Sequence, residues 1–67
     1  MVNFDVLEGQ WKQIAGKARE QWGNLTDDEL AEVEGRAERL AGLIQEKYGT
    51  SREEADRSVR AFFEKYK

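Results

Sequence analysis

Four carboxylates lie close together between residues 27 and 32, and they are the side chains of this sequence best suited to binding a cation or moving a proton. They are Asp27, Asp28, Glu29 and Glu32. Calcium and magnesium prefer carboxylate oxygens, but dedicated calcium loops also contain a glycine and spaced ligands that this segment lacks. A catalytic acid–base pair needs a pocket that perturbs its pKa values, and a chain of 67 residues has little room for one. The cluster therefore predicts neither a metal site nor a catalytic pair.

The composition removes the other common routes to catalysis. The chain has no histidine and no cysteine, so it lacks the commonest general base, a thiol nucleophile, a disulfide and the usual ligands of structural zinc. We therefore expect no catalytic residue, no cofactor and no metal, and we predict that the protein is not an enzyme.

The two tryptophans could either bind nucleic-acid bases or pack in the core. Exposed indole rings could stack on nucleic-acid bases, but each ring can also bury about 150–250 Å² in a core. Trp11 and Trp22 lie on one apolar stripe with helical spacing, which favours the core. The residues that we predict to anchor the core are Trp11, Ile14, Trp22, Leu40, Ile44, Tyr48 and Phe62.

Two glycines occupy positions where helices disfavour them. Gly16 and Gly42 fall inside predicted helices and far from the apolar stripes, where a glycine costs about 1 kcal/mol relative to alanine. One hypothesis is close contact with another helix or a second subunit at these points, because glycine permits near approach of backbones. The alternative is simple tolerance of glycine on a solvated face.

The elements that must position these residues are helices. The chain has no proline, and apolar residues recur at a period near 3.6, which predicts an all-α fold with helices at about 5–22, 27–33, 35–48 and 52–66. Gly23 is expected to end the first helix in a left-handed conformation, and Thr26 to Glu29 form a capping box for the second. A helix continuing to residue 48 would be about 33 Å long, longer than a compact domain of this size, so a bend is expected at Glu34 and Gly35.

An internal repeat supports this division. A shift of 26 positions aligns residues 8–23 with residues 34–49 and gives six identities in 16 pairs. Each copy contains a longer helix, a glycine, a capping sequence and a second helix. We therefore predict one domain, residues 1–67, built from two packed helical hairpins, residues 1–33 and 34–67.

Charge and hydropathy limit the partners. Net charge is −3, which disfavours nucleic acid and anionic lipid without excluding nucleic acid. Residues 24–38 carry six acidic side chains against one basic, whereas residues 39–67 carry seven basic against five acidic, a division that suits self-association or a basic partner. No apolar run is long enough to span a membrane, and the start of the sequence has no export signal. We expect a cytoplasmic protein, monomeric or weakly homo-oligomeric, with an unknown macromolecular partner and no membrane attachment.

Several short strings, taken in order, resemble the signature of the CsbD-like family. They include Trp11-Lys12-Gln13, Glu20-Gln21-Trp22-Gly23, Leu25-Thr26-Asp27-Asp28, Leu40-Ala41-Gly42 and Gln45-Glu46-Lys47-Tyr48-Gly49. The resemblance implies a small bacterial protein of the general stress response, with two helical hairpins and no assigned reaction. We expect it to act through a charged helical surface, by macromolecular binding or self-association; the alternative is a nucleic-acid-associated hairpin module.

Overall fold

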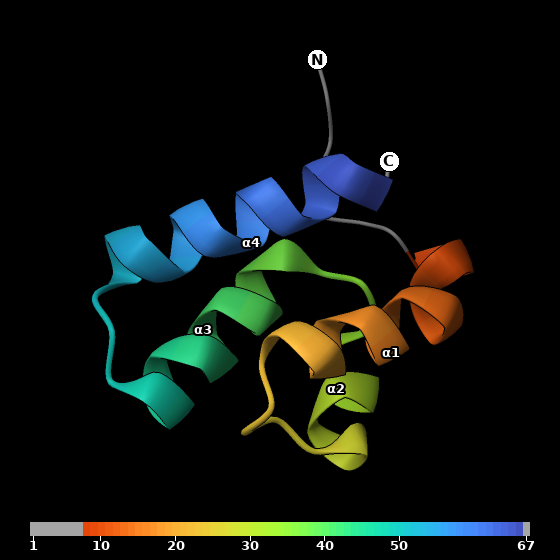
Figure 1. Ribbon diagram of the computed structural model, residues 1–67, viewed down its shortest axis with the longest axis horizontal. Coiled ribbons are helices and arrows are strands. Elements are labelled where there is room, and N and C mark those ends of the chain that lie inside the picture. The colour runs from red at the N-terminus through yellow and green to blue at the C-terminus, as the bar shows by residue number, and fades with distance from the viewer. Residues whose placement is uncertain (1–7, 67) are drawn as a thin grey trace.

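The computed structural model describes residues 8–66 and places them in one 3₁₀ turn and four α-helices (Figure 1). In chain order these are η1 (Glu8–Gln10), α1 (Trp11–Gln21), α2 (Asp27–Val33), α3 (Ala37–Tyr48) and α4 (Arg52–Tyr66). The all-α fold of two helix pairs is confirmed. The predicted start of the first helix, at residues 5–7, lies outside the described residues, and the chain enters α1 through η1, since 3₁₀ turns are common at helix ends.

The first hairpin reverses direction without a left-handed glycine. In the last backbone hydrogen bond of α1, the Trp22 N–H donates to the Ala18 carbonyl oxygen at 2.8 Å. Trp22 itself has left the helical conformation, with φ −120° and ψ 83°. A tight turn follows, in which the Leu25 N–H donates to the Trp22 carbonyl oxygen at 3.1 Å. Gly23 is not among the described residues with positive φ. The prediction for Gly23 was therefore wrong, because an extended Trp22 and this turn already redirect the chain.

The predicted capping box at the start of α2 is confirmed. The Thr26 hydroxyl accepts from the Glu29 N–H at 3.1 Å, and the Glu29 carboxylate accepts from the Thr26 N–H at 3.0 Å. Leu25 and Leu30 flank this box, and both are 1% exposed, the positions at which a hydrophobic staple fixes the entry of a chain into a helix. Local sequence thus determines where this short helix begins.

The predicted bend falls at Glu34 and Gly35, but the third helix begins at Ala37 instead of residue 35. Both residues have positive φ, 55° and 76°, and the Arg36 N–H donates to the Val33 carbonyl oxygen at 3.0 Å. This is the geometry of a type I′ turn, which requires two left-handed residues in succession. Because Glu34 and Gly35 form this turn, they cannot belong to a helix, and α3 begins two residues after the predicted start at residue 35.

In the second hairpin, glycine closes the helix as predicted. Gly49 has φ 67° and donates its N–H to the Gln45 carbonyl oxygen at 2.9 Å, which ends α3. The Ser51 hydroxyl then accepts from the Glu54 N–H at 3.1 Å and caps α4. Three residues separate α3 from α4, whereas five separate α1 from α2. The shorter connection brings α3 and α4 into extensive contact.

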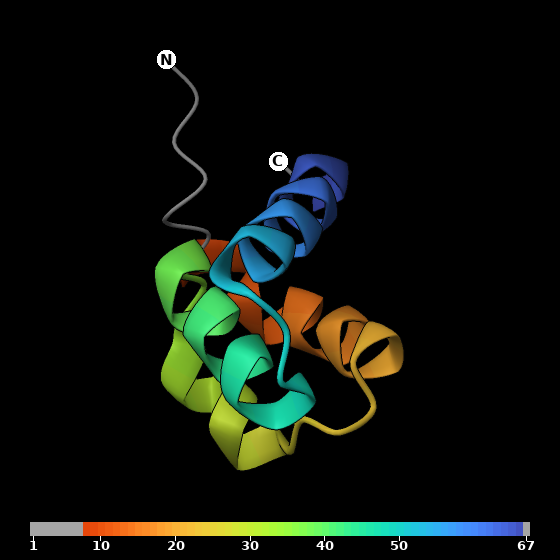
Figure 2. The same cartoon turned by 90° about the vertical axis from the view of Figure 1, so that its left-hand side faces the viewer.

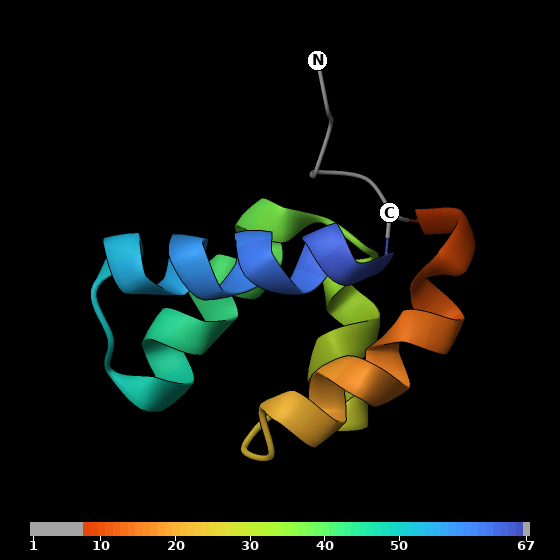
Figure 3. The same cartoon turned by 45° about the horizontal axis from the view of Figure 1, so that its top comes forward.

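The two hairpins meet through aromatic rings. Figures 1 and 2 show α4 along one side of the molecule and α2 along the opposite side, with α1 and α3 between them, and Figure 3 shows α4 running across the molecule from the α3 side to the α1 side. Trp22 packs edge-on against Phe62 with ring centroids 5.1 Å apart, and Trp11 lies 6.1 Å from Phe63. Such pairs add about 0.5–1.5 kcal/mol each beyond their buried area.

The core of the described residues contains only hydrophobic side chains. Six of the predicted anchors are buried, with no more than 7% exposed, and they are Trp11, Ile14, Trp22, Leu40, Ile44 and Phe62. Tyr48 is 39% exposed, so its prediction as a core anchor was wrong. It is the last residue of α3, and its hydroxyl oxygen accepts from the Asn24 N–H at 3.0 Å, which holds the ring against the α1–α2 turn with one side in water.

Candidate binding surface

The carboxylates of α2 are tied to the neighbouring helices. Glu29 uses one carboxylate oxygen for the capping box and the other for Lys47 of α3, whose ammonium lies 2.6 Å away. Asp27 pairs with Arg19 of α1 at 2.8 Å. The described residues contain no cluster suited to a metal ion. These contacts give the Asp27 and Glu29 side chains a role in joining helices.

The ion pair between Glu29 and Lys47 shifts the pKa values of both side chains. The hydrogen bond from Lys47, followed by that from the Thr26 backbone, holds the pKa of Glu29 below its ordinary value of 4.5. The same hydrogen bond raises the pKa of Lys47 above its ordinary 10.5. Both shifts favour the charged forms, so the pair stays ionised across the neutral range.

The carboxyl end of α2 is completed by side chains from two other helices. The indole N–H of Trp11 donates to the Leu30 carbonyl oxygen at 2.7 Å, and the guanidinium of Arg39 donates to the Glu32 carbonyl oxygen at 3.0 Å. Arg39 also pairs with the Glu34 carboxylate at 2.7 Å. The last carbonyls of a helix have no partner within it, and here α1 and α3 supply partners. Trp11 is thereby held in the core and is not free to stack on a base.

A groove of about 580 Å³ runs between α1 and α2. Its lining consists of Trp11, Lys12, Ala15, Gly16, Asp27, Leu30, Ala31 and Glu34. We call its apolar and small lining residues the floor. Lys12 belongs to α1 and defines the α1 bank, whereas Asp27 of α2 and Glu34, the residue after α2, define the α2 bank. An apolar centre with a charged rim is the usual composition of a protein–protein interface.

Gly16 lies exposed in this groove, and a Cβ atom added to it would meet nothing within 4 Å. The same is true of a Cβ added to Gly42, which does not line the groove. No helix of the described chain therefore packs closely on either glycine. The hypothesis of close contact within the chain was wrong, because α2 approaches α1 on the side of Trp11 and Leu30; contact with a second subunit stays a prediction.

A second groove, of about 530 Å³, separates α2 from α3. It is lined by Glu29, Glu32, Val33, Glu34, Arg39 and Leu43. Arg39 and Glu34 pair across it, and Glu29 is engaged by Lys47. These ion pairs occupy the polar rim, so this groove offers fewer free groups to a partner than the α1–α2 groove.

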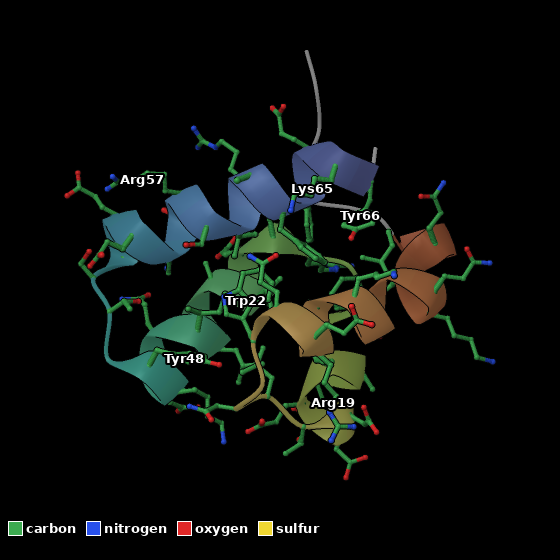
Figure 4. The ribbon with its side chains drawn as sticks, viewed as in Figure 1. Arg19, Trp22, Tyr48, Arg57, Lys65 and Tyr66 are labelled. Carbon is green, nitrogen blue, oxygen red and sulfur yellow. The ribbon has the colours of Figure 1, made fainter. Side chains whose placement is uncertain are left out.

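Some basic side chains form ion pairs between helices, whereas others extend into solvent. Figure 4 shows Arg19 directed from α1 toward α2, whereas Arg57 extends from α4 away from the body of the molecule. Arg57, Arg60 and Lys65 are exposed on α4. Arg57 borders only a shallow depression of about 310 Å³ with Glu54, Ser58 and Ala61. The outer face of α4 is thus of mixed charge.

Sequence reasoning located Gly16 but missed the groove around it. Ala31, which lines the groove together with Gly16, stands out neither by residue type nor by spacing, and Lys12 is one of several lysines. The missing information was the relative placement of α1 and α2. The pairing of Trp11 with the Leu30 carbonyl, which fixes that placement, has no signal in the sequence.

Over the described residues, fold and surface together define a small four-helix protein with an open groove between α1 and α2. Comparison with known proteins places it further: the model of the CsbD-like family matches residues 5–57. The chain belongs to this family. It is 59% identical over 64 residues to a UPF0337 protein of Bordetella pertussis, covering 96% of this chain and 97% of that one.

Other bacterial relatives span nearly the same length. A UPF0337 protein of Pseudomonas aeruginosa is 52% identical over 61 residues, which cover 91% of this chain and 94% of the relative. The UPF0337 protein YjbJ of Salmonella typhimurium is 48% identical over 59 residues, 88% of this chain and 84% of that protein. Within the described residues, every helix is too short or too polar to cross a membrane.

Proposed function

We propose that the protein is a non-enzymatic member of the bacterial general stress response that acts in the cytoplasm by binding macromolecules through its helical surface. Membership of the CsbD-like family supports the stress-response part of this proposal. The wholly apolar core supports the binding part, since every described ionisable side chain is left at or near the surface.

The observation that carries the proposal is the α1–α2 groove. It combines a floor of Trp11, Ala15 and Leu30 with the open backbone of Gly16. A partner can therefore approach the α1 backbone closely and cover apolar atoms at the same time, which is how interface centres gain most of their affinity.

A photo-crosslinking amino acid placed at Ala31 tests this function in stressed cells. Ala31 is exposed and lines the groove, and Ser58 on the outer face of α4, also exposed, serves as the matched control. We expect discrete macromolecular adducts from position 31 that position 58 does not give. Adducts that are absent from position 31, or identical at both positions, would contradict the proposal.

A nucleic-acid role is favoured by one observation, the exposed Arg57, Arg60 and Lys65 of α4. The same helix also carries four acidic residues, Glu53, Glu54, Asp56 and Glu64, and carboxylates repel phosphate. A salt titration of binding to duplex and single-stranded DNA separates the two functions, because phosphate contacts give an affinity that falls steeply with salt. We expect no binding at low salt; binding that is lost in Arg57→Glu would instead support the nucleic-acid role.

A further inference from the structure

We propose that the α1–α2 groove receives a second copy of this chain, and that two copies associate about a twofold axis passing near Gly16. This inference rests on the proposed function, because it names a partner for the same surface. It is carried by the open glycine and by the distribution of charge on the two banks of the groove.

No contact within the described chain explains why residue 16 is a glycine. Gly16 lies in the middle of α1, where glycine is among the least favourable residues for a helix. Nothing in the described chain lies close enough to require the absence of a side chain there. A helix from outside the chain would require it, because two backbones can approach closely only where side chains are small. Two further small residues, Ala15 and Ala31, line the same groove.

The charges on the two banks of the groove are opposite in sign. Lys12, on the α1 bank, is exposed and has no ion-pair partner among the described residues. Asp27 and Glu34, on the α2 bank, each pair through one carboxylate oxygen, with Arg19 and Arg39. Each therefore keeps a second oxygen that can accept from another cation.

A twofold axis would bring the oppositely charged banks of two copies together. An axis that runs along the groove places the α1 bank of one copy opposite the α2 bank of the other, so that each Lys12 faces carboxylates and each pair of contacts occurs twice. The groove is thus complementary to itself in charge as well as in its small central residues. Few apolar residues line the groove, so we expect a weak dimer whose population depends on concentration.

A single-cysteine experiment tests the geometry directly, because the chain contains no cysteine of its own. Gly16→Cys places a thiol near the proposed axis, and Gly42→Cys places one at a half-exposed helical position outside the groove, where an added Cβ likewise meets nothing within 4 Å. On mild oxidation we expect covalent dimers from Gly16→Cys at concentrations where Gly42→Cys remains monomeric. Equal crosslinking of both variants, or none in Gly16→Cys, would overturn the proposal.

Sedimentation equilibrium of the full chain then tests the contacts without a covalent bond. Gly16→Leu fills the groove and should weaken self-association at least about tenfold, the scale of a residue at the centre of an interface. Gly42→Leu should leave it unchanged. Lys12→Glu should also weaken it, whereas Lys17→Glu, an exposed lysine outside the groove lining, should not. A purely monomeric wild-type chain at millimolar concentration would refute the inference.

The two proposals fail separately. If position 31 crosslinks to other macromolecules while the chain stays monomeric, the inference about self-association is wrong and the proposed function stands. If the chain dimerises through Gly16 and the crosslinker at position 31 captures only a second copy of this chain, the inference about self-association stands and binding of other macromolecules is contradicted.

Discussion

Trp11 of α1 donates its indole N–H to the carbonyl oxygen of Leu30 in α2 across 2.7 Å, inside the core. Leu30 lies in the last turn of a seven-residue helix, where carbonyl groups have no partner of their own. One side chain therefore both fills the core and terminates a neighbouring helix. The seven residues of α2 are too few to form a stable helix alone, and contacts of this kind supply what the segment lacks.

Replacing Trp11 by phenylalanine should destabilise the protein more than replacing Trp22 by phenylalanine. Both changes remove part of an aromatic ring from the core, but only Trp11→Phe leaves the buried Leu30 carbonyl oxygen without its donor. An unsatisfied buried group costs about 1–3 kcal/mol, and this is the expected difference between the variants in urea denaturation. Equal losses would show that ring volume, and not the hydrogen bond, matters at residue 11.

The Glu29–Lys47 pair should make stability depend on pH in a defined direction. The pKa of Glu29 is lower in the folded chain than its ordinary 4.5, so the carboxylate stabilises the fold above that value and the contribution disappears as pH falls through the folded pKa. The pKa of Lys47 is raised above 10.5, so its contribution is present below that value and is lost as pH rises beyond it.

Glu29→Gln isolates the charge, because glutamine still completes a capping box. We expect its melting temperature to fall below that of the wild type at pH 7 and to converge with it as the pH falls through the lowered pKa of Glu29. The difference should also shrink at high salt, since the pair is partly exposed. A difference that persists unchanged at acid pH would assign the effect to packing.

Gly49 and Gly23 should respond differently to alanine although they align in the internal repeat. Gly49 has φ 67°, and a Cβ there would meet nothing within 4 Å, so the penalty is that of the left-handed backbone alone, about 1–2 kcal/mol. Gly23 has no positive φ, so Gly23→Ala should change the free energy of unfolding little. Guanidinium denaturation of both variants measures the contrast, and similar losses would contradict it.

Gly42→Ala should stabilise the protein. Gly42 lies inside α3 with open space around its Cα, and alanine is favoured over glycine by about 1 kcal/mol within a helix. We expect a higher melting temperature with no change in oligomeric state. A lower melting temperature would mean that an unseen neighbour packs on Gly42.

The sequence predicted most of what depends on local chemistry. The capping box at Thr26, the closing glycine at 49, the bend at Glu34 and Gly35 and the aromatic stripe all follow from residue type and spacing. The internal repeat stays a prediction. The two helix caps, Thr26 and Ser51, are 25 positions apart while the two glycines are 26 apart, so the alignment would need a one-residue deletion in the second turn.

What the sequence did not predict depends on tertiary placement. Tyr48 matches Trp22 in the repeat, yet Trp22 is covered by Phe62 whereas Tyr48 stands at the end of α3. The α1–α2 groove likewise results from how far two helices separate around Trp11 and Leu30. Periodicity defines the face that a helix buries, but it carries no information on the gap that remains between two helices.

Because both ends of α2 are fastened by side chains from α1 and α3, the segment before Val33 is not a self-sufficient folding unit. Arg19 and Trp11 reach it from earlier in the chain, and Lys47 and Arg39 from later. We therefore expect the two halves to unfold together. Native-state hydrogen exchange should therefore find one shared opening reaction for the slowest amides of all four helices.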